Sequence, residues 1–280
     1  AQGLASSLVN TIGVVLQGSV SSSYYIQFVD GAQHAANERG FDLLLTAPQG
    51  TPEAFSRSVR TRHKVDGVLF TGVTEYIKPL YDSGVPVCYA GRRLPWDTRR
   101  VNVYGGFSGY RKVAPSLLHS RGCQKIVYFE VMLGMVMETI RRDKEVIEDF
   151  VISSGLSPEQ VIFFFSETSQ CSEAYGRLRE MFQAPDRPDG IFVVDGGLAS
   201  PVYTLLSQCG LSVPGDVKLF SSIQTPNEGE LLQPGLTAYL VNSYQMGYNA
   251  AAKLIQMVQG GVPDDNLTYV PYSFIERGSV

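Results

Sequence analysis

The chain has 280 residues, of which 44% are hydrophobic and 18% charged, and its formal net charge is −4 at pH 7. This composition is that of a globular protein and excludes a disordered chain, and the length suffices for about two domains. The acidic balance, with a sequence pI near 5.5, predicts no polyanion-binding face, so we expect this chain alone not to bind DNA.

Short apolar runs recur along the chain and are hydrophobic at nearly every position. Strands that are covered by helices on both faces have this pattern. The predicted strands are residues 12–16, 42–46, 67–70, 85–90, 101–104, 125–129, 161–165, 190–194, 217–220, 236–241 and a last, alternating one over 270–275. The pattern predicts parallel sheets in an α/β fold.

Helical periodicity appears between several of these runs. Residues 22–39, 200–208 and 244–258 each place their apolar side chains on one helical face and are followed by glycine. Pro115 falls in the helix expected after residues 101–104 and predicts a kink there or a later start. No Ser/Gly-rich or charged linker separates two halves, so we expect the chain to cross more than once between two lobes.

Signals for export, metal binding and disulfides are absent from the sequence. No run of about 18 apolar residues occurs, and the first residues lack the features of a secretion signal. The cysteines are scattered without CxxC spacing, which predicts buried thiols in a reducing cytosol: Cys88, Cys123, Cys171 and Cys209. The histidines form no HExxH or HxxxH pattern, so we expect no zinc site.

Catalytic motifs are also missing. The segment Gly105-Gly106-Phe107-Ser108-Gly109 follows a predicted strand but is neither GxGxxG nor GxxxxGK[ST], so it predicts a tight turn in preference to a nucleotide site. No GxSxG motif occurs. The acidic residues of 138–149 alternate with basic ones, which is typical of a solvated helix face. We therefore expect that the chain is not an enzyme and that it binds no cofactor and no metal.

Polar residues follow the predicted strands at their carboxyl ends, where open α/β sheets bind ligands. Two tyrosines stand at the start of the first helix as well. Such a rim of hydroxyls and charges suits a small polar ligand. The ligand-binding candidates from this rule are Ser19, Tyr24, Tyr25, Thr46, Thr71, Arg92, Glu130 and Asp195.

Several ordered segments resemble the effector-binding core of LacI/GalR-type bacterial repressors, and they span almost the entire chain. These segments are Asn10-Thr11-Ile12-Gly13-Val14-Val15, Val65-Asp66-Gly67-Val68, Gly84-Val85-Pro86-Val87, Arg121-Gly122-Cys123-Gln124-Lys125-Ile126, Gly210-Leu211-Ser212-Val213-Pro214-Gly215-Asp216-Val217, Pro234-Gly235-Leu236-Thr237 and the closing Arg277-Gly278-Ser279-Val280.

The resemblance implies two similar Rossmann-like lobes with parallel sheets, joined by three crossovers, in a type I periplasmic-binding-protein-like fold. The expected division is a hinge remnant over 1–10, an N-terminal lobe over 11–102 and 241–263, and a C-terminal lobe over 103–240 and 264–280. It also implies a small-molecule effector, a homodimer in the cytoplasm, and operator DNA contacted through a headpiece that is missing from this chain. No membrane partner is expected.

Departures from the family pattern concentrate where the effector would bind. Gly91 and Arg92 stand where an Asp is usual, and only Asp195 remains of an Asn-Asp pair. Gln224 takes the place of the Asp in a Gly-Phe-Asp turn, and the cleft arginine aligns with Arg141 or Arg142. Fewer carboxylates beside retained arginines favour an anionic ligand, such as a sugar phosphate or sugar acid. A neutral ligand, or none, stays open.

Two further classes remain as alternatives to a regulator. A periplasmic sugar-binding protein would share the two-lobe architecture, and an upstream secretion signal in place of a helix-turn-helix would identify it. An α/β enzyme would be identified by turnover of its ligand.

Overall fold

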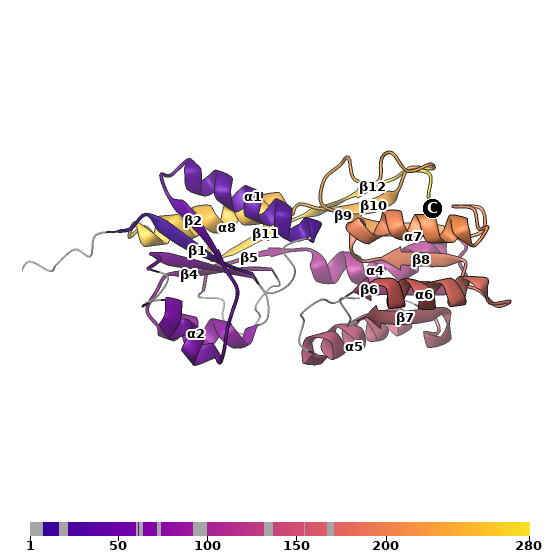
Figure 1. Ribbon diagram of the computed structural model, residues 1–280, viewed down its shortest axis with the longest axis horizontal. Coiled ribbons are helices and arrows are strands. Elements are labelled where there is room, and N and C mark those ends of the chain that lie inside the picture. Colours follow the sequence, from indigo (N-terminus) through magenta and orange to yellow (C-terminus); the bar gives the residue numbers. More distant parts are fainter. Residues whose placement is uncertain are drawn as a thin grey trace, which may run out of the picture. The chain divides into compact units, whose positions relative to one another are not determined.

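The computed structural model describes residues 8–16, 22–59, 61, 64–71, 74–91, 100–131, 137–153, 155–166 and 171–280. These residues form two compact units, each assembled from separate stretches of the chain (Figure 1). The first unit comprises Ala1–Val20, Tyr24–Gly105 and Ser243–Val270, and the second comprises Ser21–Ser23, Gly106–Asn242 and Pro271–Val280. Crossovers near residues 105, 242 and 270 join the two units, so the expected repeated crossing is present.

The first unit is built on a sheet whose strand order is β11-β5-β4-β3-β1-β2. All of its strand pairs are parallel. The strands are β1 (Thr11–Leu16), β2 (Asp42–Thr46), β3 (Gly67–Thr71), β4 (Val87–Gly91), β5 (Asn102–Gly105) and β11 (Leu267–Val270). Because β11 pairs with β5, the segment 267–270 lies in the first sheet, which differs from the expected placement of 264–280 in the second lobe.

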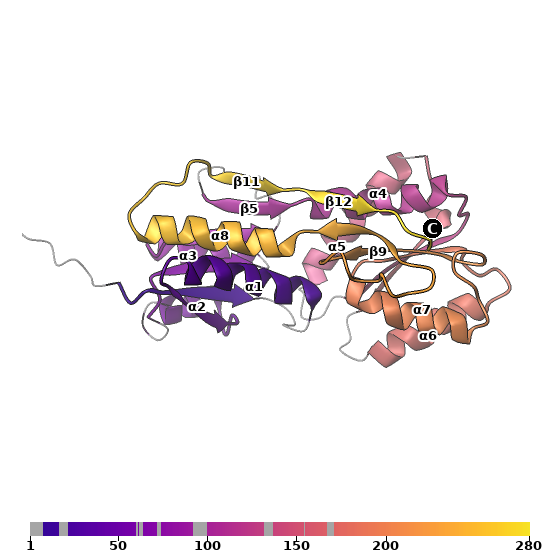
Figure 2. The same ribbon diagram turned by 90° about the horizontal axis from the view of Figure 1, so that it is seen from above.

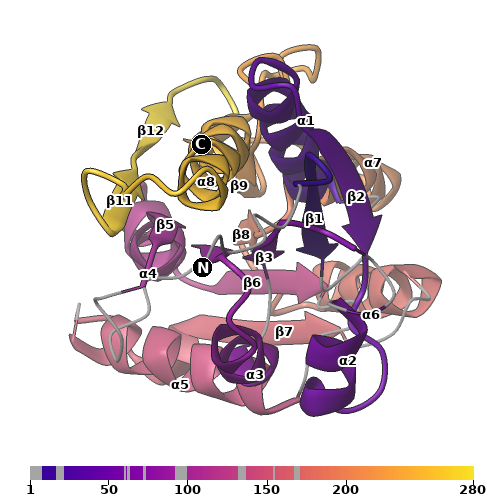
Figure 3. The ribbon, with the colours of Figure 1, turned by 90° about the vertical axis from the view of Figure 1, so that its left-hand side faces the viewer.

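Helices cover both faces of this sheet. In Figure 3, α1 (Ser23–Asn37) and α8 (Ser243–Val258) lie on one side of β1, and α2 (Pro52–Ser58) and α3 (Ile77–Asp82) lie on the other. Phe55 of α2 and Ile77 of α3 pack against the buried side chains of β1, β3 and β4. This double cover explains why β3 is buried at every position and reads as one apolar run.

The second unit repeats the plan with strand order β12-β10-β9-β8-β6-β7. Its strand pairs are parallel except for β10 and β12, which are antiparallel. The strands are β6 (Ile126–Val131), β7 (Val161–Ser166), β8 (Gly190–Val193), β9 (Lys218–Ile223), β10 (Thr237–Val241) and β12 (Tyr272–Ile275).

Two apolar cores flank the second sheet, one on each face. The helices α4 (Phe107–Ser120) and α5 (Met137–Ser153) pack on one face with Tyr128, Phe192 and Phe220. The helices α6 (Cys171–Gln183) and α7 (Ala199–Gln208) pack on the other. Figure 2 shows α4 and α7 on opposite sides of β9. Adjacent residues of each strand therefore enter different cores.

The predicted strands and the predicted helices are confirmed, and their observed ends lie within three residues of the predicted ones. Two points differ. The last predicted strand corresponds to β12, but its first residue, Val270, ends a separate and unpredicted strand, β11, which belongs to the other sheet. Of the two outcomes expected from Pro115, the later start is wrong, because α4 begins at Phe107 and contains Pro115 in its interior; the kink stays a prediction. Short 3-10 turns also occur at Thr74–Tyr76, Pro158–Gln160 and Gly196–Leu198.

Helices α1 and α8 cross at two glycines. A Cβ on Gly31 would lie 2.0 Å from the carbonyl oxygen of Tyr244, and a Cβ on Gly247 would lie 1.9 Å from that of Phe28. Real side chains cannot occupy such positions, so the two backbones meet only because both residues lack a Cβ. The crossing is what holds α8, a late segment of the chain, against α1.

Among the described residues, no helix is long and apolar enough to cross a membrane. The described cysteine thiols are free, with Cys88 and Cys123 buried and Cys209 partly exposed. Burial raises the pKa of the Cys88 thiol to about 12 and that of the Cys123 thiol to about 11, so both are protonated at neutral pH.

Candidate functional site

In the first unit, Tyr25 and Thr71 meet at the carboxyl end of β3. The Tyr25 hydroxyl forms a hydrogen bond with the Thr71 side chain, and burial, with a smaller effect from Tyr89, raises the pKa of Tyr25 to about 12. Gly91 lies beside this pair with a φ of +144°, and a Cβ there would sit 3.3 Å from the Tyr89 hydroxyl. The group offers neutral hydroxyls, because the phenol stays protonated at any physiological pH.

Tyr24 extends the same group along α1. Its ring contacts the Tyr25 ring edge-on at 5.2 Å between centroids and stacks on Phe28 at 6.0 Å. Phe28 is fully buried, so it fixes the first turn of α1 against the sheet. The first unit thus holds a largely buried group of aromatic rings and hydroxyls at this strand end.

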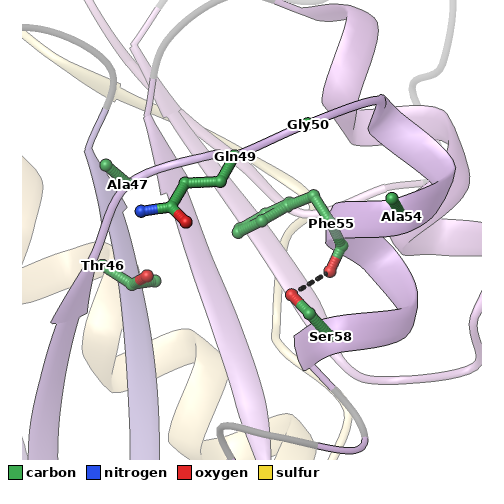
Figure 4. A pocket seen from close by; sticks show the side chains of 7 residues that line it. All are labelled: Thr46, Ala47, Gln49, Gly50, Ala54, Phe55 and Ser58. Atoms are coloured by element: carbon green, nitrogen blue, oxygen red, sulfur yellow. Dashed lines mark hydrogen bonds between the residues drawn. The ribbon is translucent and has the colours of Figure 1, made fainter.

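Thr46 lies elsewhere on the first unit, at the end of β2. It lines a cavity of about 410 Å³ together with Gln49, Phe55 and Ser58 (Figure 4). The Ser58 hydroxyl donates to the Phe55 carbonyl oxygen at 2.8 Å. Because β1 separates β2 from β3 in the sheet, this cavity is distinct from the Tyr25–Thr71 group.

In the second unit, Glu130 of β6 forms a buried ion pair with Arg111 of α4. The Arg111 Nη2 atom lies 2.9 Å from Glu130 Oε1, and the two side chains are 18% and 6% exposed, respectively. The Tyr128 hydroxyl donates to Glu130 Oε2 at 3.4 Å. A carboxylate removed from water is tolerated here because its charge and both of its oxygens have partners.

A buried tyrosine connects this ion pair to β9. The Tyr110 hydroxyl forms hydrogen bonds with Ser222 and Arg111, and burial raises the pKa of Tyr110 above its usual value. The Ser222 hydroxyl in turn donates to the Val194 carbonyl oxygen. The ends of β6, β8 and β9 are therefore joined by one polar network inside the second unit.

Gln224, Asp195 and Glu228 form a second polar group just beyond β8 and β9. The Gln224 backbone N–H donates to Glu228 Oε2 at 3.2 Å, and the nearby Asp195 carboxylate adds to burial in raising the pKa of Glu228. Gln224 is 8% exposed, and its Oε1 atom is buried without a hydrogen-bond partner among the described residues. Such an orphaned buried acceptor costs free energy unless a donor reaches it.

Gly196 permits the close fit of this group. A Cβ there would lie 2.3 Å from the Ser222 carbonyl oxygen and 3.1 Å from Glu228 Oε2. The Asp195 side chain accepts from the Gly197 N–H at 3.0 Å, which fixes the turn after β8. Replacing Gly196 by any other residue would push the two strand ends apart.

The predicted residues that the structure describes fall into three sets. The structure brings together Tyr24, Tyr25 and Thr71 in the first unit, and Glu130, Asp195 and Gln224 at neighbouring strand ends in the second. Thr46 stands apart in its cavity. Ser19, Arg92 and the side chains of Arg141 and Arg142 lie outside the described residues.

The sequence did not predict Arg111 and Glu228 as residues of the site. Arg111 lies within a helix, and Glu228 lies five residues beyond β9, so neither follows a strand directly. An isolated acidic pair such as Glu228 and Glu230 in a polar loop gives no signal by itself. In the part of the chain that the structure describes, no cluster of three or more His, Cys, Asp or Glu residues could hold a metal ion.

Comparison with known proteins gives one family match and several regulators. Residues 116–280 match the family model of the periplasmic binding protein-like domain. The ribose operon repressor of Escherichia coli K12 is 22% identical over 292 residues, which cover 100% of this chain and 84% of the repressor. The HTH-type transcriptional regulator KdgR of Bacillus subtilis 168 is 19% identical over 268 residues, covering 93% of this chain and 77% of KdgR.

Solved structures show the same fold. The transcriptional regulator CelR in complex with cellobiose has a TM-score of 0.77 and 21% identity over 98% of this chain and 85% of CelR. A LacI family transcriptional regulator from Enterococcus faecium with bound ribose has a TM-score of 0.76 and 20% identity over 96% of this chain and 98% of that one. With a family match over more than half of its length, the chain belongs to the periplasmic binding protein-like domain family and has the fold of the effector-binding core of LacI-type regulators.

Proposed function

We propose that this chain is the ligand-sensing domain of a bacterial LacI/GalR-type transcription regulator. A small sugar or sugar-derived effector binds at the carboxyl ends of its strands and changes the DNA affinity of a helix-turn-helix segment outside this chain. The observation that carries the proposal is the group of Gln224, Asp195 and Glu228, in which Gln224 is buried and its Oε1 acceptor has no partner among the described residues. A hydroxyl of a bound ligand would supply the missing donor.

Charge favours a neutral effector over an anionic one. At and just beyond the described strand ends of the second unit lie three carboxylates, Glu130, Asp195 and the loop residue Glu228, and Arg111 is already paired with Glu130. Among the described residues of this group, acceptor atoms outnumber free cations, which repels a phosphate or carboxylate and suits the hydroxyl donors of a sugar. The bound ribose and cellobiose of the two structural neighbours belong to this chemical class.

In this proposal the regulator acts as a cytoplasmic homodimer on operator DNA. Effector binding favours one of two global states, and the two states differ in their DNA affinity. The periplasmic transport alternative gains no support from the relatives named above, which are regulators.

A thermal-shift screen tests the effector class directly. The chain is heated with neutral sugars, sugar phosphates and sugar acids, each at a saturating concentration. A ligand present at about 100 times its Kd adds about 2.7 kcal/mol of stability, which raises the midpoint clearly. We expect a shift with a neutral sugar. A shift confined to anionic compounds would overturn the neutral class, and no shift from any sugar would overturn the proposal.

A matched pair of variants locates the site. Gln224→Met keeps the shape of the side chain but removes the amide, and we expect it to weaken sugar binding about 2- to 10-fold, the worth of one neutral hydrogen bond. Gln183→Met makes the same change at an exposed position on α6 and should leave the Kd unchanged. Equal affinities for both variants would remove Gln224 from the site.

Coupling to DNA needs a protein in which a helix-turn-helix segment precedes this chain. Operator binding is titrated with and without the identified sugar. An allosteric coupling of 1–3 kcal/mol corresponds to roughly a 5- to 150-fold change in operator affinity. Identical affinities in the two titrations would contradict a regulatory role while leaving the sugar site intact.

A further inference from the structure

The loop between β9 and β10 carries both Gln224 and Glu228, so its shape decides what the candidate effector group presents. Within the loop, the Leu236 N–H donates to the Gly229 carbonyl oxygen at 3.0 Å, and the Glu228 N–H donates to that of Thr225 at 3.2 Å. Gly229 adopts a φ of +72°. The loop is therefore folded back on itself, yet these few bonds are local.

Arg277, near the end of the chain, reaches into this loop with its guanidinium group. Its Nη1 atom donates to the carbonyl oxygens of Leu236 at 2.9 Å and Glu228 at 3.2 Å, and its Nη2 atom donates to that of Pro226. Three carbonyls, two from the first part of the loop and one from its last residue, thus converge on one side chain. The planar fork of an arginine, with its five donors, can serve several acceptors at once.

The backbone around Arg277 is anchored independently of that guanidinium. The Arg277 N–H donates to Thr237 Oγ1 at 3.0 Å, and Thr237 Oγ1 donates to the Arg277 carbonyl oxygen at 2.9 Å. Two residues on, the buried Ser279 hydroxyl accepts from the Thr237 N–H at 2.8 Å and donates to the Leu219 carbonyl oxygen at 2.6 Å. The segment 277–279 is therefore tied to the sheet strands β9 and β10.

Contact between the loop and this segment is close enough to require glycine. A Cβ on Gly235 would lie 3.0 Å from Arg277 Cδ, and a Cβ on Gly278 would lie 2.7 Å from Pro234 Cβ. The aliphatic part of Arg277 consequently packs on the loop while its head group binds the carbonyls.

We propose that Arg277 is a positioning residue that fixes the β9–β10 loop on the sheet and thereby sets the positions of Gln224 and Glu228 in the candidate effector group. One consequence of this inference rests on the proposed function: effector affinity should depend on a residue that contacts no ligand. The geometric part, that Arg277 holds the loop, stands on the contacts of Arg277 alone.

Hydrogen exchange tests the geometric part without any ligand. Arg277→Met removes the donors and keeps the aliphatic packing, Arg277→Lys keeps the charge but loses the fork, and Ser279→Ala loosens the same chain segment without touching the loop. We expect Arg277→Met to lower the protection of the Gln224, Glu228 and Leu236 amides about tenfold or more. Arg277→Lys should lower it partially, and Ser279→Ala should leave it unchanged.

The titration of Glu228, followed by NMR of its labelled side-chain carboxyl carbon, gives a second readout. Burial raises the pKa of Glu228 in the folded chain, so loosening the loop in Arg277→Met should return it toward its usual value, whereas Ser279→Ala should not. If lower stability alone were the cause, the pKa of Glu228 would change equally in Arg277→Met and Ser279→Ala.

The two proposals fail in different ways. Unchanged loop protection and an unchanged Glu228 titration in Arg277→Met would overturn the positioning role, whatever any ligand does. Lost protection together with an effector Kd weakened about tenfold supports both proposals. Lost protection in a protein that binds no sugar at all supports the positioning role and overturns the proposed function.

Discussion

At the scale of single residues, Arg111 and Glu130 form an ion pair that is largely shielded from water. Shielding strengthens their attraction but also makes each charge costly when it is left alone. The pair lies at the end of β6, beside the Tyr110 hydroxyl and Ser222. The pair therefore helps to hold the ends of β6 and β9 together, in addition to placing two charges there.

Removing only one member of this pair should be strongly destabilising. We expect Arg111→Met to lower the free energy of unfolding by about 3–5 kcal/mol, because Glu130 is left buried and unpaired. The double variant Arg111→Met/Glu130→Gln should recover a large part of that loss, because it leaves no buried charge. Denaturant unfolding of the four proteins in the cycle measures the coupling. A double variant as unstable as the sum of the singles would show that the pair does not interact.

Glu228 should make stability depend on pH. Burial raises its folded-state pKa, so the stabilisation from its proton is fully present below the unfolded-state pKa and is lost as the pH rises through the folded-state pKa. At pH 7 the charged carboxylate therefore costs stability. We expect ligand-free Glu228→Gln to melt at a higher temperature than the parent at pH 7, with the difference disappearing toward pH 4.

Thermal melts between pH 4 and pH 7 check this dependence. Glu180→Gln, at an exposed position on α6, controls for the general effect of removing one negative charge. A stabilisation of Glu228→Gln that is the same at every pH would show that titration is not its cause.

The residues of the candidate site were predictable to the extent that they follow strands directly. Glu130 and Asp195 were found by this rule, and Gln224 by its place in a family turn, because strand ends are fixed by the apolar pattern. Arg111 and Glu228 reach the same place from a helix and from a loop. Their contacts depend on side-chain direction and on loop shape, which sequence periodicity does not encode.

At the scale of secondary structure, the continuously apolar strands could be predicted because helices cover both of their faces. The short helices α2 and α3 could not, because six or seven residues give no clear helical period. The strand expected at residues 270–275 is confirmed as β12 apart from its first two residues, whereas β11 over 267–270 was not predicted. Pro271 ends β11, and the next residues pair with β10 in the second sheet. Tertiary contacts, and not the local sequence, decide which sheet each strand joins.

The crossing of α1 and α8 gives a prediction at this scale. Gly31→Ala and Gly247→Ala would each place a methyl group against backbone atoms of the other helix. We expect each to lower the free energy of unfolding by about 1–3 kcal/mol, the usual cost of overpacking, or more if the helices cannot separate. Chemical denaturation measures the change.

Gly176 provides the matched control for this prediction. It lies within α6, and a Cβ there would meet nothing within 4 Å. Gly176→Ala should therefore stabilise the protein by about 0.5–1 kcal/mol, because alanine is the better helix former. If all three substitutions had the same sign, helix propensity and not the crossing would govern the effect.

At the scale of the whole molecule, each unit is built from stretches that are far apart in the sequence. The second sheet takes its edge strand β12 from residues 272–275, and Ser279 fastens β9 to β10. The three-crossover plan was accessible from the family resemblance and from the missing linker. The exact residue at which the chain passes back to the second unit, residue 270, could not be predicted, because it depends on the pairing of β11 with β5.

Deleting Pro271–Val280 should therefore damage the two units unequally. The second unit loses β12, whose register covers four residue pairs with β10. At roughly 1 kcal/mol for each hydrogen bond, the loss is about 4 kcal/mol or more. Hydrogen exchange should show lost protection in β9 and β10 and retained protection in β1 and β3. Equal loss in both units would show that they unfold as one cooperative body.

The discontinuous units also impose an order on biosynthesis. The first sheet lacks the covering helix α8 until the ribosome has passed residue 258, and its strand β11 until residue 270, although β1 was made long before. Throughout that interval, Gly31 and the neighbouring face of α1 have no partner helix. A nascent first unit exposes apolar surface while the whole second unit is being translated, and that is the period in which it most needs a chaperone.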